Sequence, residues 1–229
     1  MAEAYAVQAL NREQWVAEGR VTSGYKVAFT TVESQQLFGT SEPVYGTLYE
    51  DMRFPSGETI PADRLAKPKL EGEIVLELSA DLPAQVLPAE EIRAGVGAFY
   101  PALEIPDGSI SGKINALDMA ADNAAAGAYV LGNRHPFTLE TDLAALSMTM
   151  EHNGKVVSSG TGAGCLGNPL NVLIWLQHAL ASAQQPMHAG QIVFCGSLVP
   201  IIHVQPGDHF LARVRELGTV GCRFAAPGE

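Results

Sequence analysis

Apolar and other residues alternate with a period of two between Leu70 and Leu78, the pattern of a β-strand whose two faces meet different surroundings. Short apolar runs at 21–30 and 44–48 are also typical of strands. Residues 148–160 form two such runs around Asn153-Gly154, a dipeptide that favours a tight hairpin turn. The C-terminal third continues with short runs and glycine-containing turns, so strands dominate the predicted structure.

Helices are predicted at fewer places. The segments predicted to be helical are 2–18, 31–38, 89–94, 116–126 and 168–180. The last has the clearest signals, because Asn168 is an N-cap residue, Pro169 suits the first helical position, and apolar residues recur at helical spacing. The sequence therefore predicts an α+β fold that is mostly β, forming a single catalytic domain over 1–229 with the segment 1–40 packed on it.

Composition and charge exclude several classes of partner. Apolar residues make up 47% of the chain, as in a globular domain with its own core. With 14 Lys and Arg against 25 Asp and Glu, the net charge is −11, so we expect neither a nucleic-acid partner nor binding to an anionic membrane. Three scattered cysteines, no signal peptide and no apolar run as long as a membrane span predict a cytoplasmic protein.

The triplet Glu71-Gly72-Glu73 is the strongest indication of chemistry. On a strand its two carboxylates share a face, about 6.5–7 Å apart at their bases, so both can reach one cation. Taken alone, alternating glutamates more often mark a solvated sheet face, and Glu77 at the same parity fits that interpretation. Glu104 changes the balance, because its neighbours are apolar and a buried carboxylate needs a partner. Three carboxylates predict a site for Mg²⁺ or Mn²⁺.

Lys26 and Asp51 are further candidates. Lys26 lies in the apolar run Tyr25-Lys26-Val27, where a lysine can act as acid, base or anion anchor, although its stem can also reach solvent past apolar neighbours. Asp51 follows a predicted strand and could orient water or relay a proton; an ordinary loop aspartate is the alternative. Known nucleophile-elbow, zinc-protease and phosphate-loop motifs are absent from the sequence.

A series of motifs in a fixed order makes the chain resemble a known family. In order, they are Gly24-Tyr25-Lys26, Tyr45-Gly46-Thr47-Leu48 with Asp51-Met52, Glu71-Gly72-Glu73-Ile74, Ala102-Leu103-Glu104-Ile105, Ala121-Asp122-Asn123-Ala124, Leu166-Gly167-Asn168-Pro169-Leu170, Gly196-Ser197-Leu198, Pro206-Gly207-Asp208 and Leu217-Gly218-Thr219-Val220. This pattern resembles the 2-keto-4-pentenoate hydratase and 4-oxalocrotonate decarboxylase group of the fumarylacetoacetate hydrolase superfamily. The resemblance runs from about Ala4 to Phe224.

The resemblance implies a rolled mixed β-sheet like the C-terminal domain of fumarylacetoacetase, with flanking short helices, a Mg²⁺ or Mn²⁺ ion, and a homo-oligomer. It carries the role of metal ligands onto Glu71, Glu73 and Glu104. It carries a catalytic role onto Lys26 and Asp51, and it places Ser197, with Lys26, against the substrate.

The implied activity is that of a hydro-lyase in aromatic-compound degradation, which adds water to a 2-hydroxy-2,4-dienoate of the 2-keto-4-pentenoate type. A 4-oxalocrotonate-type decarboxylase is the first alternative, and a C–C hydrolase or an inactive partner subunit is the second. Ala28 stands where a glycine is commoner in the family, and Gly112-Lys113 where a bulky aromatic and a polar residue are usual. These departures bear on the shape of the pocket and leave the expected metal ligands in place.

Overall fold

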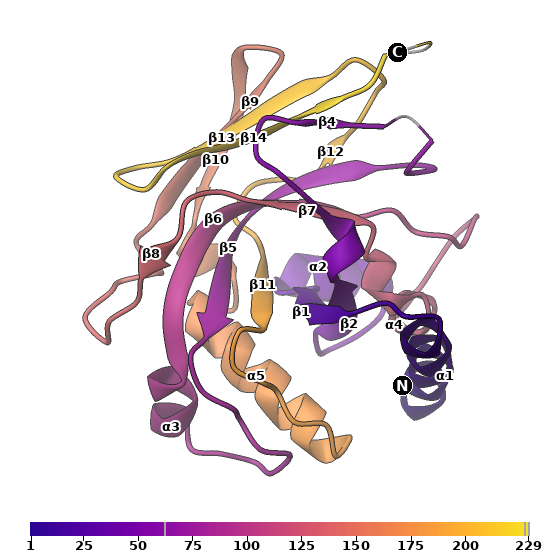
Figure 1. The fold of residues 1–229 in the computed structure, drawn as a ribbon, viewed down its shortest axis with the longest axis vertical. Helices are drawn as coiled ribbons and strands as arrows, with labels where there is room; N and C mark the ends of the chain where they lie inside the picture. The colour runs from indigo at the N-terminus through magenta and orange to yellow at the C-terminus, as the bar shows by residue number, and fades with distance from the viewer. Residues whose placement is uncertain (62, 227, 229) are drawn as a thin grey trace.

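The computed structural model describes residues 1–61, 63–226 and 228 and contains two sheets flanked by short helices (Figure 1). The larger, nine-stranded sheet has the order β2 (Val44–Tyr49), β1 (Thr22–Ala28), β11 (Ile192–Ser197), β5 (Lys69–Leu78), β6 (Val96–Ile105), β7 (Ala128–Leu131) and β3 (Arg53–Phe54), with β12 (Ile202–His203) on β5 and β8 (His135–Pro136) on β6. The second has the order β10 (Lys155–Thr161), β9 (Ser147–His152), β13 (His209–Val214), β14 (Gly218–Phe224) and β4 (Thr59–Ile60).

The larger sheet is rolled, and one short continuous segment connects the strands at its two edges. Strand β2 at one edge runs through the 3₁₀ turn η1 (Glu50–Met52) directly into β3 at the other edge. The hydroxyl of Tyr129 on β7 donates to Ser23 on β1 at 3.0 Å, although three strands separate β1 from β7 in the sheet. The face inside the roll therefore has its own apolar filling, which includes Val75, Tyr129 and Phe194.

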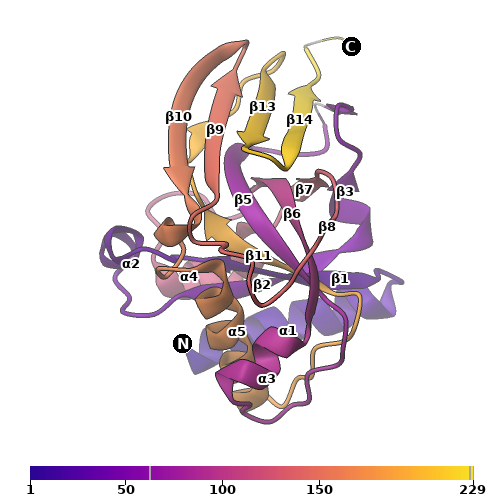
Figure 2. The same ribbon diagram turned by 90° about the vertical axis from the view of Figure 1, so that its left-hand side faces the viewer.

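The outer face of the roll packs on the second sheet and on the helices. Side chains of α5 (Pro169–Ser182) and of strands β9, β13 and β14 share one buried apolar cluster with the outward residues of β5, such as Ile74. A Cβ at Gly72 would overlap the side chain of Met148, so the glycine of the Glu71-Gly72-Glu73 triplet makes room for a methionine of the second sheet. Figure 2 shows the second sheet at one end of the molecule and α5 at the other.

The remaining helices lie at the periphery, and their bounds are α1 (Ala2–Ala17), α2 (Val32–Phe38), α3 (Ala89–Ala94) and α4 (Ala116–Ala121), with the turns η2 (Asn123–Ala125) and η3 (Gly162–Gly164). Helix α1 is held by the buried side chain of Gln8, which donates to the carbonyl oxygens of Tyr45 on β2 and Ala120 on α4. No helix in the described part of the chain is long and apolar enough to span a membrane.

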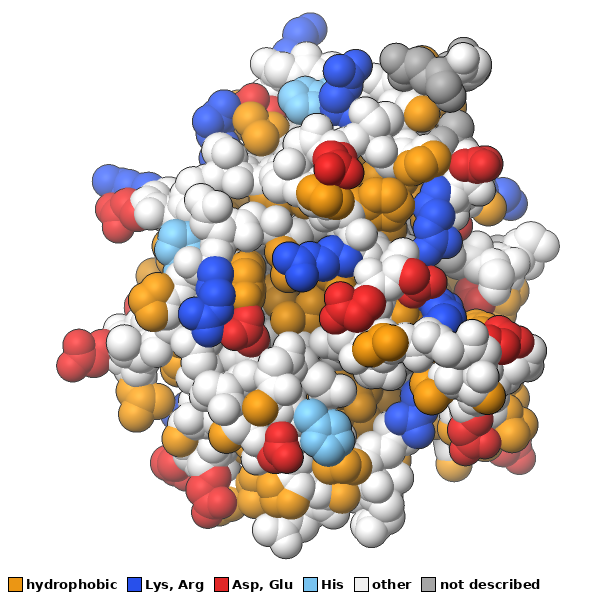
Figure 3. All heavy atoms as spheres, viewed as in Figure 1, with side chains coloured by type: hydrophobic (Ala, Val, Ile, Leu, Met, Phe, Trp, Pro, Cys, Tyr) orange, Lys and Arg blue, Asp and Glu red, His pale blue; other side chains and the backbone are white. Residues whose placement is uncertain are grey.

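On the face shown in Figure 3, acidic and basic side chains are interspersed, and hydrophobic side chains gather near its middle. The surface as a whole carries an excess of acidic groups, in line with the net charge of −11. Attraction of an anionic ligand therefore has to come from a local cation or a bound metal rather than from the overall field.

The predicted α+β class with a rolled, mostly β structure is confirmed, and most predicted elements lie within a few residues of their expected bounds. The short helix after Thr31 begins with a capping box, in which Thr31 accepts from the Ser34 N–H, and ends at the left-handed Gly39. The helix predicted over 116–126 is wrong in its second half: it ends at Ala121 and a left-handed turn follows. Tertiary hydrogen bonds of that turn override local helix propensity.

Substitutions at two glycines with positive φ test the close approach of strands β1 and β11 in the rolled sheet. Gly24 on β1 has φ +155, and a Cβ there would overlap the carbonyl oxygen of Ile192, whereas Gly39 has φ +71 and open space around it. We expect Gly24→Ala to lower the free energy of unfolding by about 3 kcal/mol or more, because β1 and β11 must separate. Gly39→Ala should cost only about 1 kcal/mol, from backbone strain alone. Urea unfolding measures both, and equal losses would contradict the close approach of these strands.

Candidate metal centre

Three glutamate side chains converge inside the rolled sheet. Glu71 and Glu73 project from the same face of β5, and Glu104 on the neighbouring strand β6 lies directly opposite Glu71 in register. One carboxylate oxygen from each residue lies within 4.8 Å of the others. Glu73 and Glu104 are fully buried, and Glu71 is partly exposed, so the cluster opens toward solvent on the Glu71 side. This geometry places the three carboxylates around one position of the size of a cation.

Lys26 reaches the same cluster from β1. Its side chain is 3% exposed and its ammonium forms an ion pair with Glu104. Strands β11 and β5 lie between β1 and β6, which would put the two backbones about 14 Å apart on a flat sheet. The contact is possible because the sheet is rolled. The burial excludes the alternative in which Lys26 extends to solvent.

The carboxylates are poorly supplied with hydrogen-bond donors. One oxygen of Glu73 accepts from the backbone N–H of Gly196 at 2.8 Å, but its other oxygen has no hydrogen-bond partner among the described residues. Among the residues that the structure describes, Glu104 forms an ion pair with Lys26, and its second oxygen is buried without a hydrogen-bond partner. Buried polar atoms left without partners are costly, so these oxygens favour a ligand that can occupy them.

Burial and mutual repulsion shift the ionisation of this cluster. Burial, and then the charge of Glu104, raise the pKa of Glu71 to about 7 and hold the pKa of Glu73 well above its ordinary range. Burial alone would lower the pKa of Lys26, but the attraction of Glu104 and Glu71 outweighs it and the pKa lies above its ordinary value. The raised pKa of the buried lysine shows a negative local field, whereas the raised pKa values of the glutamates come first from burial and then from the neighbouring carboxylates.

Glu77 provides an internal comparison, because it lies on the same face of the same strand as Glu71 and Glu73. Burial tends to raise its pKa, but Arg134 donates to it at 2.8 Å, Tyr100 also donates to it, and the net shift of its pKa is downward. The face predicted from the period of two therefore carries one glutamate with side-chain donors, Glu77, and one, Glu73, with an oxygen that is buried and unpartnered among the described residues. The solvated-face interpretation describes Glu77 and fails for Glu73, which is fully buried.

Gly196 supplies a donor that the sequence did not reveal. The register between β11 and β5 shifts between Phe194 and Ser197, and Gly196 has φ +89, so its N–H turns toward Glu73. A Cβ at Gly196 would overlap the side chain of Thr30, and the Cys165 thiol lies 3.1 Å from the Gly196 carbonyl oxygen. A glycine at the end of a strand, followed by a polar residue, was the available signal.

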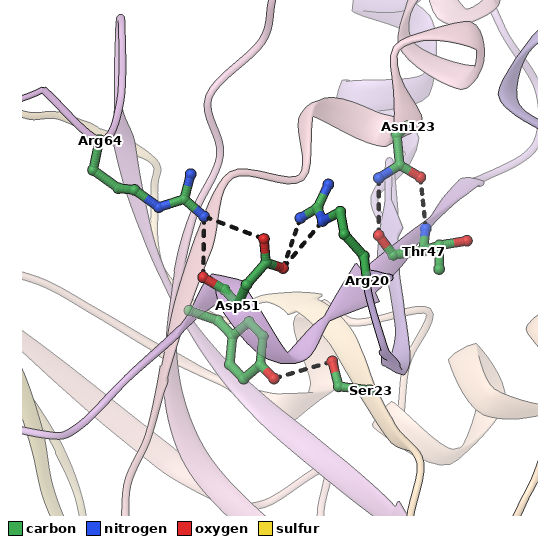
Figure 4. A network of polar contacts seen from close by, with 7 residues as sticks. Arg20, Ser23, Thr47, Asp51, Arg64 and Asn123 are labelled. Carbon is green, nitrogen blue, oxygen red and sulfur yellow. Dashed lines mark hydrogen bonds and ion pairs between the residues drawn. The ribbon is translucent and has the colours of Figure 1, made fainter. Parts of the chain in front are cut away.

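The structure places Ser197 next to the cluster and Asp51 in a separate network. Ser197 lies opposite Glu73 in register, and its hydroxyl donates to the carbonyl oxygen of Val199 at 2.5 Å. Asp51 in η1 is half-exposed; Arg20 donates to its carboxylate at 2.8 Å and Arg64 to its backbone oxygen at 3.0 Å (Figure 4). Four of the predicted site residues thus gather around one position, Ser197 borders it, and Asp51 pairs with arginines.

Two surface cavities, of about 500 and 630 Å³, are lined by other residues than the four charged ones. The larger one is nevertheless close to the cluster, because Thr30, which contacts Gly196, is among its lining residues. The smaller one is lined by Lys67, Lys69 and His203, and the charge of Lys69 acts on Glu71. Neither cavity is lined by a member of the carboxylate cluster.

The donor set fits a hard divalent cation. Three carboxylates and one ammonium carry a formal charge of −2 when all are ionised, which a divalent ion would balance. Carboxylate oxygens are the ligands that Mg²⁺ and Mn²⁺ prefer, and the unpartnered oxygens of Glu73 and Glu104 are free to bind such an ion.

The family model for the C-terminal domain of fumarylacetoacetate (FAA) hydrolase matches residues 10–225. The chain belongs to this family. The resemblance inferred from the ordered motifs is therefore confirmed. Within the FAA hydrolase family, a protein of Paraburkholderia xenovorans named 2-keto-4-pentenoate hydratase is 38% identical over 97% of this chain and 83% of its own length.

Two further relatives extend this comparison. A protein of Comamonas testosteroni named 2-hydroxyhexa-2,4-dienoate hydratase is 32% identical over 91% of this chain and 80% of its own. The solved structure of 4-oxalocrotonate decarboxylase from Pseudomonas putida G7, complexed with magnesium and adipate, superimposes with a TM-score of 0.92 at 31% identity, covering 97% of this chain and 85% of that one. These members of the FAA hydrolase family bear the names of both activities that the motifs implied.

The raised pKa of Glu71 predicts how stability depends on pH. Between about 4.5 and about 7 the folded chain binds more protons at Glu71 than the unfolded chain, so stability falls as pH rises through this window. We expect the melting temperature of the metal-free protein to fall by about 5–10 °C more than that of Glu71→Gln between pH 5 and pH 8, because the shift is equivalent to about 2.5 kcal/mol over this range. Glu77→Gln, which removes a carboxylate of lowered pKa, should not remove this fall. Identical pH profiles for the wild type and Glu71→Gln, measured calorimetrically, would refute the shift.

Proposed function

We propose that the chain is a divalent-metal-dependent hydro-lyase that adds water to a 2-hydroxy-2,4-dienoate of the 2-keto-4-pentenoate type. The convergence of Glu71, Glu73 and Glu104 around one position, with Lys26 buried beside them, is the observation that carries the proposal. The names of the relatives that are 38% and 32% identical over most of the chain support this choice of substrate class.

Glu71, Glu73 and Glu104 would hold Mg²⁺ or Mn²⁺, and the magnesium in the decarboxylase structure supports this assignment. When bound, the ion would supply Lewis-acid stabilisation of negative charge on the carboxylate and 2-oxygen of the substrate. The site is pre-organised, because the ligands come from two adjacent strands with fixed register.

Lys26 is proposed as a proton-transfer group and as an anchor for the substrate carboxylate. Its ammonium is protonated and buried, so it can donate a hydrogen bond or a proton to a substrate bound beside the carboxylates. In the reaction, the dienol loses the proton of its 2-hydroxyl and takes one up at its far carbon, which gives a conjugated 2-oxo acid. Water then adds across the remaining carbon–carbon double bond, with its hydroxyl on the carbon farther from the 2-oxygen and its proton on the nearer one. Both steps need a group that exchanges protons beside the 2-oxygen.

Ser197 and Asp51 complete the proposed machinery in different ways. Ser197 lies beside Glu73 and presents a hydroxyl that can turn from Val199 to a substrate oxygen. Asp51 pairs with Arg20 at 2.8 Å, and we propose that it relays a proton or orients water. Its pairing with two arginines makes it the member of the set with the least direct support from geometry.

The wider setting is inferred from the same resemblance. We expect the enzyme to form a homo-oligomer, to be cytoplasmic and to act in the degradation of aromatic compounds. The hydratase names of the relatives support the metabolic role.

A decarboxylase remains the second candidate, and two observations favour it. The decarboxylase structure superimposes with a TM-score of 0.92. A decarboxylase of this type must hold a second carboxylate, and Lys69, which lines the smaller cavity together with Lys67, is a cation whose charge acts on Glu71. We retain the hydratase because the relatives of higher identity carry that name.

The metal assignment can be tested with two glutamates of one strand. Glu73→Gln should reduce both the affinity for Mg²⁺ and the turnover number by about 10-fold or more, because it removes a charged ligand and leaves the fold intact. Glu77→Gln should change either quantity less than about 2-fold, since Arg134 and Tyr100 surround that carboxylate. Isothermal titration with Mg²⁺ measures the affinity, and a steady-state assay measures the turnover number. Equal effects of the two substitutions would contradict the assignment of Glu73 as a metal ligand.

The two chemistries differ in whether carbon dioxide is released. We expect the Mg²⁺ form to hydrate 2-hydroxypenta-2,4-dienoate, seen as loss of the dienol absorbance, without forming CO₂. A dicarboxylic 4-oxalocrotonate should be a poor substrate in the same assay. Rapid CO₂ release from the dicarboxylate, with no hydration of the monoacid, would replace the hydratase by the decarboxylase and leave the metal site unchanged.

A further inference from the structure

The turn η2 has an unusual backbone. Asn123, Ala124 and Ala125 have φ values of 52°, 51° and 55°, so three successive residues with side chains adopt the left-handed conformation. This conformation is disfavoured for L-amino acids because Cβ approaches the following carbonyl oxygen. All three residues are buried, and the surrounding contacts must therefore stabilise the turn against its own preference. The motif Ala121-Asp122-Asn123-Ala124 had no role in the site described above.

At one end, the turn is bonded to the strand beside Lys26. The Asn123 amide accepts from the Thr47 N–H at 2.7 Å and donates to the Thr47 carbonyl oxygen at 2.8 Å, so it pairs with β2 as a neighbouring strand would (Figure 4). Thr47 follows Gly46, which is the register partner of Lys26. A Cβ at Gly46 would overlap the carbonyl oxygen of Asn123, so the turn lies directly against this position.

At the other end, the turn is bonded to the strands that carry the glutamates. The carbonyl oxygen of Ala125 accepts from the N–H of Asp107 at 2.8 Å, just beyond the end of β6. The Asp107 carboxylate accepts from the N–H groups of Ala66 at 2.8 Å and Lys67 at 2.6 Å, just before β5. One strained turn thus connects the strand pair of Lys26 with the strand pair of Glu71 and Glu104.

We propose that η2 positions Lys26 relative to the three carboxylates and that Asn123 is the positioning residue. The carboxylates need no such connection, because β5 and β6 are directly hydrogen-bonded to each other. Lys26 does need it, because two strands separate β1 from β6, and β1 lies near the edge of the sheet, where β2 is the last strand. Loosening η2 should therefore displace the ammonium of Lys26 while the proposed metal ligands keep their mutual geometry. The proposal rests on the proposed function for its activity measurement.

The test compares two asparagines of the same segment. Asn123→Gly removes both bonds to Thr47, while glycine accepts a φ of 52° without strain. Asn115→Ala is the matched control: Asn115 caps α4 by accepting from the N–H groups of Leu117 and Asp118 and has no bond to β2. We measure kcat, KM and Mg²⁺ affinity of both variants, and hydrogen exchange of the peptide that contains Lys26.

We expect the substitution of Asn123 to change kcat but not the affinity for Mg²⁺. Asn123→Gly should lower kcat by about 10-fold or more, since small displacements of a reacting group have large effects on rate, and should leave Mg²⁺ affinity within about 2-fold of the wild type. Asn115→Ala should leave both near wild type. An unchanged kcat in Asn123→Gly, or a parallel loss of kcat and Mg²⁺ affinity in both variants, overturns the proposal because a general loss of stability would then explain the data.

A second variant and a second criterion cover the cases in which the first comparison cannot be made. If Asn123→Gly does not fold, Asn123→Asp, which retains the acceptor for the Thr47 N–H and loses the donor, is judged by the same criteria. If the wild type hydrates no dienoate, the proposed function has failed and exchange alone decides the positioning. Faster exchange around Lys26 in the Asn123 variant, with the Asn115 variant unchanged, supports it; equal exchange in both contradicts it.

Discussion

The buried ion pair between Lys26 and Glu104 sets the main physical constraint on this fold. Charges removed from water lose hydration, and the loss is recovered only when partners are held in close and fixed geometry. Here three carboxylates share one interior position with a single ammonium, so the cluster is short of positive charge. A bound divalent cation would remove this deficit. The same shortage makes the cluster suited to bind an ion that can also stabilise charge on an oxyanion.

Bringing Lys26 to Glu104 requires the sheet to roll, and several features of the chain serve this purpose. Gly24 lets β1 approach β11 more closely than a side chain would permit. The bulge at Gly196 turns a backbone donor toward Glu73. The bond from Tyr129 to Ser23 and the left-handed turn at Asn123 connect strands that are distant in the sheet order. The fold is thus adapted at specific positions to the assembly of one charged site.

The sequence predicted the carboxylates but not how they are partnered. Period-two alternation placed Glu71 and Glu73 on one face, and apolar neighbours marked Glu104 as buried, because both signals are local. The same pattern could not separate Glu77 from the pair, since Arg134 is distant in the chain and reaches it only after folding. The contact of Lys26 with Glu104 depends on the curvature of the sheet, and the early end of helix α4 depends on bonds to Thr47. The order of the motifs supplied part of the information that local patterns lack, because it indicated the family directly.

Diffraction from crystals grown with Mn²⁺, recorded at the manganese absorption edge, tests the metal centre most directly. We expect one strong anomalous peak, which marks the position of the ion, between the carboxylate oxygens of Glu71, Glu73 and Glu104. Glu104 should then be shared between the ion and Lys26. A peak at another acidic cluster, or three carboxylates that remain protonated beside an unoccupied position at saturating Mn²⁺, would contradict the assignment of this cluster as the metal centre.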